Sequence, residues 1–325
     1  MVRKIRTALY ILLLLAVAAG IFWIFAPHPE ADTTVTFDAV VLGEDLDAYL
    51  AQAESRYSDI RPQNQKQIVW AYPASKARTP LAIVYVHGFS AGPAEIRPLP
   101  DKVASAIGAN LYFTRLAGHG RSNDAMGDAS VNDWINDFAE AMAIGKKLGE
   151  KVIVVATSTG ASLASWAAAQ PDFAGDIDGL VLISPNYGPQ ATGSFLLTAP
   201  YAETFVKLII GETRGFEPRN EAQAANWTYQ YPAKALIQMG LLVKMARQAE
   251  AGRIRVPALF VYSPHDAVVR PELTEQVIAR WGGPNQTILV ENSDDESHHV
   301  IAGDIVSPST TDQLATGVVN WIKGL

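Results

Sequence analysis

Residues 151–162 read KVIVVATSTGAS, the most informative stretch of the sequence. An unbroken run of β-favouring residues leads into the small Ala156, then into a hydroxyl group at Ser158. An alanine-rich stretch of helical character follows directly. The pattern predicts a strand, a very tight turn and a helix, with Ser158 at the turn.

Such a turn brings backbone segments close together, so it needs small residues two positions before and after the central residue. Ala156 and Gly160 occupy these positions. The usual pattern of a nucleophile elbow is Gly-x-Ser-x-Gly, and Ala156 departs from it while staying small. Ser158 is therefore a candidate nucleophile. The competing interpretation is an ordinary Ser/Thr/Gly turn after a strand.

The composition limits the class of protein. The chain has 325 residues, 49% hydrophobic and 18% charged, which indicates a folded globular protein and excludes extensive disorder. A net charge of -7 gives no reason to expect nucleic acid as a partner. The sequence contains no cysteine, which excludes disulfides, thiolate catalysis and cysteine metal sites.

The N-terminus predicts a membrane anchor. An uncharged apolar run from Ala8 to Ala26 is long enough to cross a bilayer, and basic residues at positions 3, 4 and 6 precede it. We expect the basic flank in the cytoplasm and the rest of the chain outside it, in the periplasm or extracellular space. The alternative is a cleaved signal peptide and a secreted protein, because Ala16-Val17-Ala18 resembles a cleavage site. The apolar run continues past that site, which favours retention.

The sequence predicts three regions: an anchor at 1–27, a connection with leading strands at 28–77, and an α/β domain at 78–325. In the connection, we expect strands near 36–41 and 67–72 and an amphipathic helix near 46–56. In the domain, short apolar strands alternate with helices, which indicates a mostly parallel sheet covered on both faces. The expected strands are 81–86, 110–116, 151–156, 179–183, 257–262 and 287–290, and the expected helices are 101–107, 131–148, 161–169, 272–281 and 311–322. An irregular insertion spans about 187–255.

Ligands of open parallel sheets bind beyond the carboxyl ends of the strands. The polar residues that follow the predicted strands include Ser158, Asp266 and His299, in that chain order. A serine, an acid and a histidine in this order are typical of one class of hydrolase.

Here the sequence resembles the α/β-hydrolases, in particular the group of monoacylglycerol lipases, bacterial carboxylesterases and lysophospholipase-like enzymes. The resemblance covers roughly residues 81–325. It rests on His87-Gly88-Phe89, Arg115-Leu116-Ala117-Gly118-His119-Gly120-Arg121-Ser122, Ser158, Asp266 and His299-Val300-Ile301. It implies the α/β-hydrolase fold with a helical cap at about 187–255.

The resemblance also implies roles. Ser158 would attack an acyl carbon, His299 would take its proton, and Asp266 would orient the imidazole. The backbone N–H groups of Phe89 and Thr159 would stabilise the oxyanion. No cofactor or metal is expected, because no His-Glu-x-x-His motif or close carboxylate cluster appears.

Each assignment has rivals in the sequence. Asp266 could be a turn carboxylate ahead of Pro271, and the rival acids are Asp294, Asp295 and Asp304. His298 adjoins His299, but in the resembling enzymes the catalytic histidine directly precedes an apolar pair. The acidic run at 294–296 is interpreted as a solvated loop, His87 and His119 as loop-fixing residues, and His265 and His28 as structural or solvent-facing.

The insertion is rich in apolar and aromatic residues, which suggests an apolar acyl pocket, although most of them could simply pack the cap. We therefore expect a serine hydrolase acting on a small-molecule or lipid ester through an acyl-enzyme, with its substrate-binding residues unknown. Acyl transfer to another acceptor, or amide or peptide cleavage, would use the same three residues. A non-catalytic binding protein that retains the fold is the alternative from another class.

Overall fold

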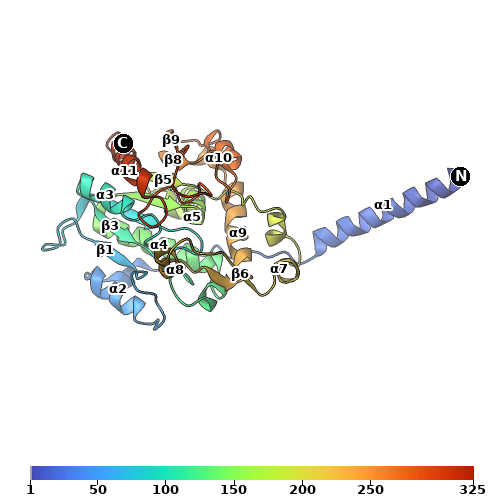
Figure 1. The fold of residues 1–325 in the computed structure, drawn as a ribbon, viewed down its shortest axis with the longest axis horizontal. Coiled ribbons are helices and arrows are strands. Elements are labelled where there is room, and N and C mark those ends of the chain that lie inside the picture. The colour runs from blue at the N-terminus through green and yellow to red at the C-terminus, as the bar shows by residue number, and fades with distance from the viewer. Residues whose placement is uncertain (1) are drawn as a thin grey trace.

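The computed structural model describes residues 2–325, and its centre is a seven-stranded sheet with helices on both faces (Figure 1). The order of the strands is β1-β3-β2-β4-β5-β8-β9. Their bounds are β1 Gln67–Val69, β2 Thr79–Val86, β3 Asn110–Phe113, β4 Gly149–Thr157, β5 Gly179–Ile183, β8 Ala258–Tyr262 and β9 Asn285–Leu289. Only the edge strand β1 runs antiparallel to its neighbour, so the predicted mostly parallel sheet is confirmed.

The apolar strands alternate their side chains between two cores. On one face, buried residues of α3 (Leu99–Ile107) and α11 (Pro308–Ile322) pack against the sheet. On the other face, the sheet is covered by α4 (Val131–Leu148), α5 (Thr159–Ala168) and α10 (Pro271–Ile278). Burial on both faces explains why these strands read as continuous apolar runs.

The segment from 187 to 255, called the cap segment below, lies between β5 and β8 and follows a mixed rather than purely helical course. It contains two 3-10 helices, η3 Ser194–Thr198 and η4 Ala251–Arg253, the helices α7 Ala202–Ile209, α8 Glu221–Asn226 and α9 Ala235–Gln248, and a two-stranded antiparallel sheet of β6 Thr213–Gly215 and β7 Gln230–Pro232. Helix α9 packs against α5, so the segment lies over the helix that begins directly after Ser158.

At the N-terminus, α1 (Val2–Phe25) projects away from the rest of the molecule (Figure 1). Its residues 3–25 are long and apolar enough to cross a membrane, and none of its most apolar part is buried against the protein. A signal sequence would have the same properties. Two short helices, η1 Ala39–Leu42 and α2 Leu46–Glu54, lie between α1 and the first strand of the sheet.

The strand expected near 36–41 is wrong. Asn136 of α4 accepts hydrogen bonds from the backbone N–H groups of Thr36 and Phe37 at 2.7 and 2.9 Å. Asn132, one turn earlier, donates to the carbonyl of Thr34 at 2.9 Å. Because side chains of a helix satisfy these backbone groups, the segment runs along α4 and does not join the sheet.

Candidate active site

Ser158 lies at a sharp turn between β4 and α5. Its φ of 51° and ψ of -115° place a non-glycine residue in a rarely occupied region of backbone space. The turn is so tight that a Cβ added to Gly160 would lie 2.4 Å from the carbonyl oxygen of His87. Ala156 is fully buried opposite Val86 and Leu182, and its methyl group fits there. Position 160 therefore requires a glycine, whereas position 156 accepts an alanine.

The structure brings the three predicted residues together. Ser158 Oγ lies 3.0 Å from His299 Nε2, and His299 Nδ1 lies 2.7 Å from Asp266 Oδ2. All three residues are buried, with exposed fractions of 8% or less. A carboxylate only accepts hydrogen bonds, so Nδ1 carries the proton and Nε2 is free to accept the Ser158 hydroxyl. This arrangement can move a proton from the hydroxyl to the imidazole.

Asp266 is held after β8 by its own backbone contacts. Its Oδ1 accepts the N–H groups of Val268 and Val269, each at 2.8 Å, which leaves Oδ2 for His299. Burial alone would lower the pKa of the His299 imidazole. The charge and hydrogen bond of Asp266, together with the charges of Glu95 and Asp295, outweigh burial and raise that pKa above its ordinary value. The site therefore favours the imidazolium that proton transfer would create.

The loop after β2 lies directly beside Ser158. A Cβ on Gly88 would lie 3.2 Å from Ser158 Cβ and 2.7 Å from Glu95 Oε1, so a glycine at this position eases the close approach of the loop. Among residues 2–325, the N–H groups of Phe89 and Thr159 find no backbone or side-chain acceptor. The N–H of Thr159 is also the first of helix α5, where the helix dipole favours negative charge. Both donors are thus available to an anion.

Glu95 is a site residue that the sequence reasoning missed. Its carboxyl group is buried and accepts the Gly88 N–H at 2.7 Å and the Tyr85 hydroxyl at 2.8 Å. Burial is the largest effect on the Glu95 carboxyl and raises its pKa, against the lowering effect of these hydrogen bonds. The group fixes the loop that carries Phe89. No signal in the sequence marks it, because a single acid in a loop looks solvent-facing.

The interpretation of residues 294–296 as a solvated loop is wrong for Asp295, which is 2% exposed. Its Oδ2 accepts the N–H groups of His299 and Val300 at 3.0 and 2.8 Å. Its Oδ1 lies 2.5 Å from an Arg219 nitrogen of the cap segment. Burial would raise the pKa of Asp295, but the donated N–H groups outweigh it and lower the pKa. Asp295 therefore holds the loop that carries His299.

The other histidines lie where they were expected. His87 is buried and accepts the N–H of Leu116 at 3.0 Å, which links the loops after β2 and β3. The ring of His119 is also buried, and burial lowers its pKa to about 4. His298 points away from the site, with its Nδ1 3.4 Å from Ser293 Oγ. His265 lies at the surface, 3.2 Å from Glu291.

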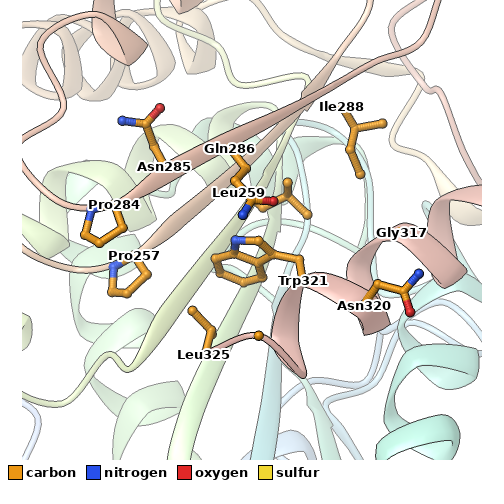
Figure 2. A pocket seen from close by; sticks show the side chains of 11 residues that line it. Pro257, Leu259, Pro284, Asn285, Gln286, Ile288, Gly317, Asn320, Trp321 and Leu325 are labelled. Carbon is orange, nitrogen blue, oxygen red and sulfur yellow. The ribbon is translucent and has the colours of Figure 1, made fainter.

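A separate pocket of about 320 Å³ lies near the amino ends of the strands (Figure 2). The amino ends of β8 and β9 and the side of α11 form it, with apolar and amide side chains from Leu259, Gln286 and Trp321 among its lining. It is therefore distinct from the Ser158 site at the carboxyl ends. Within residues 2–325, no group of three or more histidine, aspartate or glutamate side chains is arranged to hold a metal ion.

The fold is the α/β-hydrolase fold, with Ser158, His299 and Asp266 together beyond the carboxyl ends of its strands. The chain belongs to the family described as serine aminopeptidase, S33, whose model matches residues 78–293. That range includes Ser158 and Asp266 and ends before His299.

The chain is similar to three proteins with lipase or lipolytic names. A thermostable monoacylglycerol lipase of Bacillus sp. (strain H-257) is 26% identical over 201 residues, which are 62% of this chain and 76% of that protein. A metagenome-derived lipolytic enzyme from the study of LipS and LipT has a TM-score of 0.67 at 20% identity, covering 82% of this chain and 100% of that one. The monoacylglycerol lipase of Paleococcus ferrophilus has a TM-score of 0.58 at 18% identity, covering 79% and 97%. The two solved structures share the fold of this chain.

Proposed function

We propose that the protein is a membrane-anchored serine hydrolase that cleaves esters of apolar acyl groups through a covalent acyl-enzyme. The observation that carries this proposal is the continuous chain of contacts from Ser158 Oγ through His299 to Asp266, at 3.0 and 2.7 Å. The residues meet at the carboxyl ends of β4 and β8 and in the loop after β9, although they are far apart in the sequence. Such an arrangement activates a hydroxyl group for attack on a carbonyl carbon.

In the proposed reaction, Ser158 Oγ bonds to the ester carbonyl carbon while its proton passes to His299 Nε2. The bond from that carbon to the alcohol oxygen then breaks, and His299 returns the proton to the departing alcohol. Water next attacks the acyl-enzyme, gives a proton to His299 and releases the acid, and the proton returns to Ser158. Asp266 keeps the imidazole in the required tautomer and stabilises its charged form.

The negative oxygen of each tetrahedral intermediate would accept hydrogen bonds from the N–H groups of Phe89 and Thr159. Within the part of the chain that the structure describes, these two donors have no protein acceptor, and they flank Ser158 on the loop after β2 and at the start of α5. Because the donors are fixed in place before the reaction, they stabilise the developing charge without reorganising. Removing one such donor typically lowers kcat by about 100-fold or more.

The cap segment supports an apolar substrate. Met239 of α9 reaches the site region, with its Sδ 3.6 Å from the side-chain nitrogen of Asn186. That nitrogen lies in turn 3.4 Å from Thr159 Oγ1. Phe89 and Tyr231 pack edge to face with ring centroids 5.3 Å apart. Apolar and aromatic side chains close to the Ser158 loop favour apolar acyl groups over highly charged substrates, and a monoacylglycerol-like lipid ester fits this chemistry.

For the N-terminus, we propose that residues 1–27 stay attached as a single membrane span. Arg3, Lys4 and Arg6 would remain in the cytoplasm, and residues 78–325 would form the catalytic domain outside it. The length of α1 supports a membrane span, as does the exposure of its most apolar part, because an apolar helix in water is unfavourable. Cleavage after the apolar run would instead release a secreted enzyme.

The test is turnover of a panel of p-nitrophenyl esters by the full chain in detergent, comparing the native protein with Ser158→Ala. We expect the variant to lose at least about 1,000-fold in kcat, the scale on which nucleophile removal acts. Ser162→Ala is the matched control, since Ser162 also lies in α5 and its hydroxyl donates to the backbone carbonyls of Ser158 and Asn186. Ester turnover that persists in Ser158→Ala would refute the assignment. Competing alcohols and peptide substrates would separate hydrolysis from acyl transfer and amide cleavage.

A further inference from the structure

Four exposed apolar side chains of the cap segment form a surface that we call the apolar cap face. They are Phe195 of η3, Tyr201 just before α7, and Leu208 and Ile209 in its last turn. Their exposed fractions are 68%, 46%, 76% and 66%, respectively. Single exposed apolar residues need no explanation, but a group on one short segment usually marks an interaction surface.

The spacing along α7 shows that this surface is more than a by-product of packing. Ala202 and Val206 are one turn apart and bury the inner side of the helix. Tyr201, Leu208 and Ile209 continue the apolar arc outward, because residues 7 and 8 positions apart lie on one side of a helix. The polar side carries Lys207, which pairs with Glu212 at 2.6 Å in solvent. The apolar arc is thus wider than packing in the cap requires.

The apolar cap face is joined to α1. The rings of Tyr201 and Phe22 stack, with centroids 5.6 Å apart and planes 14° from parallel. Figure 1 shows α7 beside the inner end of α1. Phe22 lies inside the apolar helix that ends at Phe25, so a membrane around that helix would reach the level of Tyr201. Aromatic rings at the boundary between lipid and water are typical of membrane proteins.

We propose that the apolar cap face docks on the lipid bilayer that α1 crosses, so that the cap segment rests on the membrane surface. This inference rests on the proposed retention of α1 as a membrane span. Docking removes four apolar side chains from water and leaves the Lys207–Glu212 pair at the level of the lipid head groups. The partner is the lipid surface itself.

Docking has a consequence for the substrate. Leu197 of η3 packs on α9, where a Cβ on Gly240 would lie 2.7 Å from Leu197 Cβ. Helix α9 packs in turn on α5, the helix that begins after Ser158. A cap held at the membrane would therefore keep the Ser158 site next to the lipid surface, which favours esters that reside in the bilayer as substrates.

The chain has no cysteine, so one introduced cysteine reports on one position. Full-length Leu208→Cys, Leu14→Cys and Leu289→Cys are each labelled with an environment-sensitive fluorophore and placed in nanodiscs of phosphatidylcholine and phosphatidylglycerol. Leu14 lies in α1 and tests the span, whereas Leu289 is an exposed residue of β9 and serves as the control. Lipids that carry a spin label on the acyl chain then act as quenchers.

We expect lipid quenching at positions 14 and 208 and none at 289. Quenching at 14 with a label at 208 that responds only to aqueous iodide would overturn docking and leave the anchor standing. Absence of lipid quenching at both positions would overturn the anchor and docking together. Contact-quenching between two labelled copies at 208 without lipid quenching would assign the face to a second copy of the chain and overturn the proposal.

A second measurement uses activity. The double substitution Leu208→Glu with Ile209→Glu should lower turnover of a long-chain monoacylglycerol in vesicles by about tenfold, since it adds charge to the docking face. Turnover of soluble p-nitrophenyl butyrate should stay unchanged. Val40→Glu with Val41→Glu is the matched control, because this exposed apolar pair lies in η1, away from the cap segment. Equal losses on both substrates, or no loss on the vesicle substrate, would contradict docking.

Discussion

A β-carbon on Gly160 would lie 2.4 Å from the carbonyl oxygen of His87, closer than real atoms approach. The contact joins the helix after Ser158 to the loop before Phe89, so it sets the distance between the proposed nucleophile and one oxyanion donor. A single hydrogen atom at position 160 is what allows the two segments to meet.

Gly160→Ala should therefore inactivate the enzyme and destabilise it by about 1–3 kcal/mol, the usual effect of forcing an extra methyl group into a packed site. Ester turnover and thermal unfolding of the full chain in detergent measure the two effects. Gly175→Ala is the matched control, because a Cβ there meets no atom within 4 Å. Full activity in Gly160→Ala would show that the turn is looser than described.

The raised pKa of His299 predicts the pH profile. Only the neutral imidazole accepts the Ser158 proton, so kcat/KM should fall as pH drops through a midpoint above 6.5, the ordinary histidine pKa. The stabilisation of the folded protein by the His299–Asp266 pair changes with pH in the opposite direction. It is complete below pH 6.5 and is lost as the pH rises through the raised pKa of His299. Initial rates between pH 5 and 9, with recovery after return to pH 8, check the prediction. A flat profile would exclude a histidine base.

Glu95 should act by positioning the loop that carries Phe89. Glu95→Ala leaves the Gly88 N–H and the Tyr85 hydroxyl without their acceptor, so kcat should fall by about 100-fold, as after loss of an oxyanion donor, with little change in KM. Glu95→Gln keeps an acceptor and should retain activity within about tenfold of the native protein. It should also move the pH midpoint downward, because a negative charge near His299 is removed.

These two variants separate positioning from a general loss of structure. A purely structural effect would lower stability in both without shifting the pH midpoint. Unchanged kcat in Glu95→Ala would contradict the role assigned to the carboxyl group.

Asp295→Ala should destabilise the protein by about 3 kcal/mol or more, because several buried N–H groups and the Arg219 guanidinium lose their acceptor together. Activity should fall as well, since the same hydrogen bonds hold the loop at His299. The neighbouring Asp294→Ala is the matched control: Asp294 is exposed and accepts one N–H, from Ser309 at 2.8 Å. Similar unfolding temperatures in the two variants would show that Asp295 is not the anchor of the loop.

Much of the fold could be predicted because its signals are local. The strands that lead to Ser158 and Asp266 are apolar runs between polar turns, and the structure places them within a few residues of their expected bounds. Helix α4 has the expected bounds, and its start is marked by the hydrogen bonds between Ser130 and Asp133. Because Ser158, Asp266 and His299 each follow a predicted strand, the sequence also predicts that they lie at the carboxyl ends of the parallel sheet.

The remainder depends on contacts between distant residues. Residues 36–41 have the composition of a strand, yet Asn136, about a hundred residues away, binds their backbone. Asp295 sits in an acidic run that resembles a solvated loop, and its burial depends on the fold around it. Glu95 acquires its role only when Gly88 and Tyr85 lie beside it. A sequence pattern does not record such partners.

The most direct test of the central claim is to locate the covalent adduct. The full chain is treated with a fluorophosphonate, digested, and analysed by tandem mass spectrometry. The proposed mechanism predicts one adduct on the Ser158 side chain, at pH 8 and not in His299→Ala, because the imidazole must remove the hydroxyl proton. An adduct on another residue, or none on a protein that still hydrolyses esters, would contradict the account.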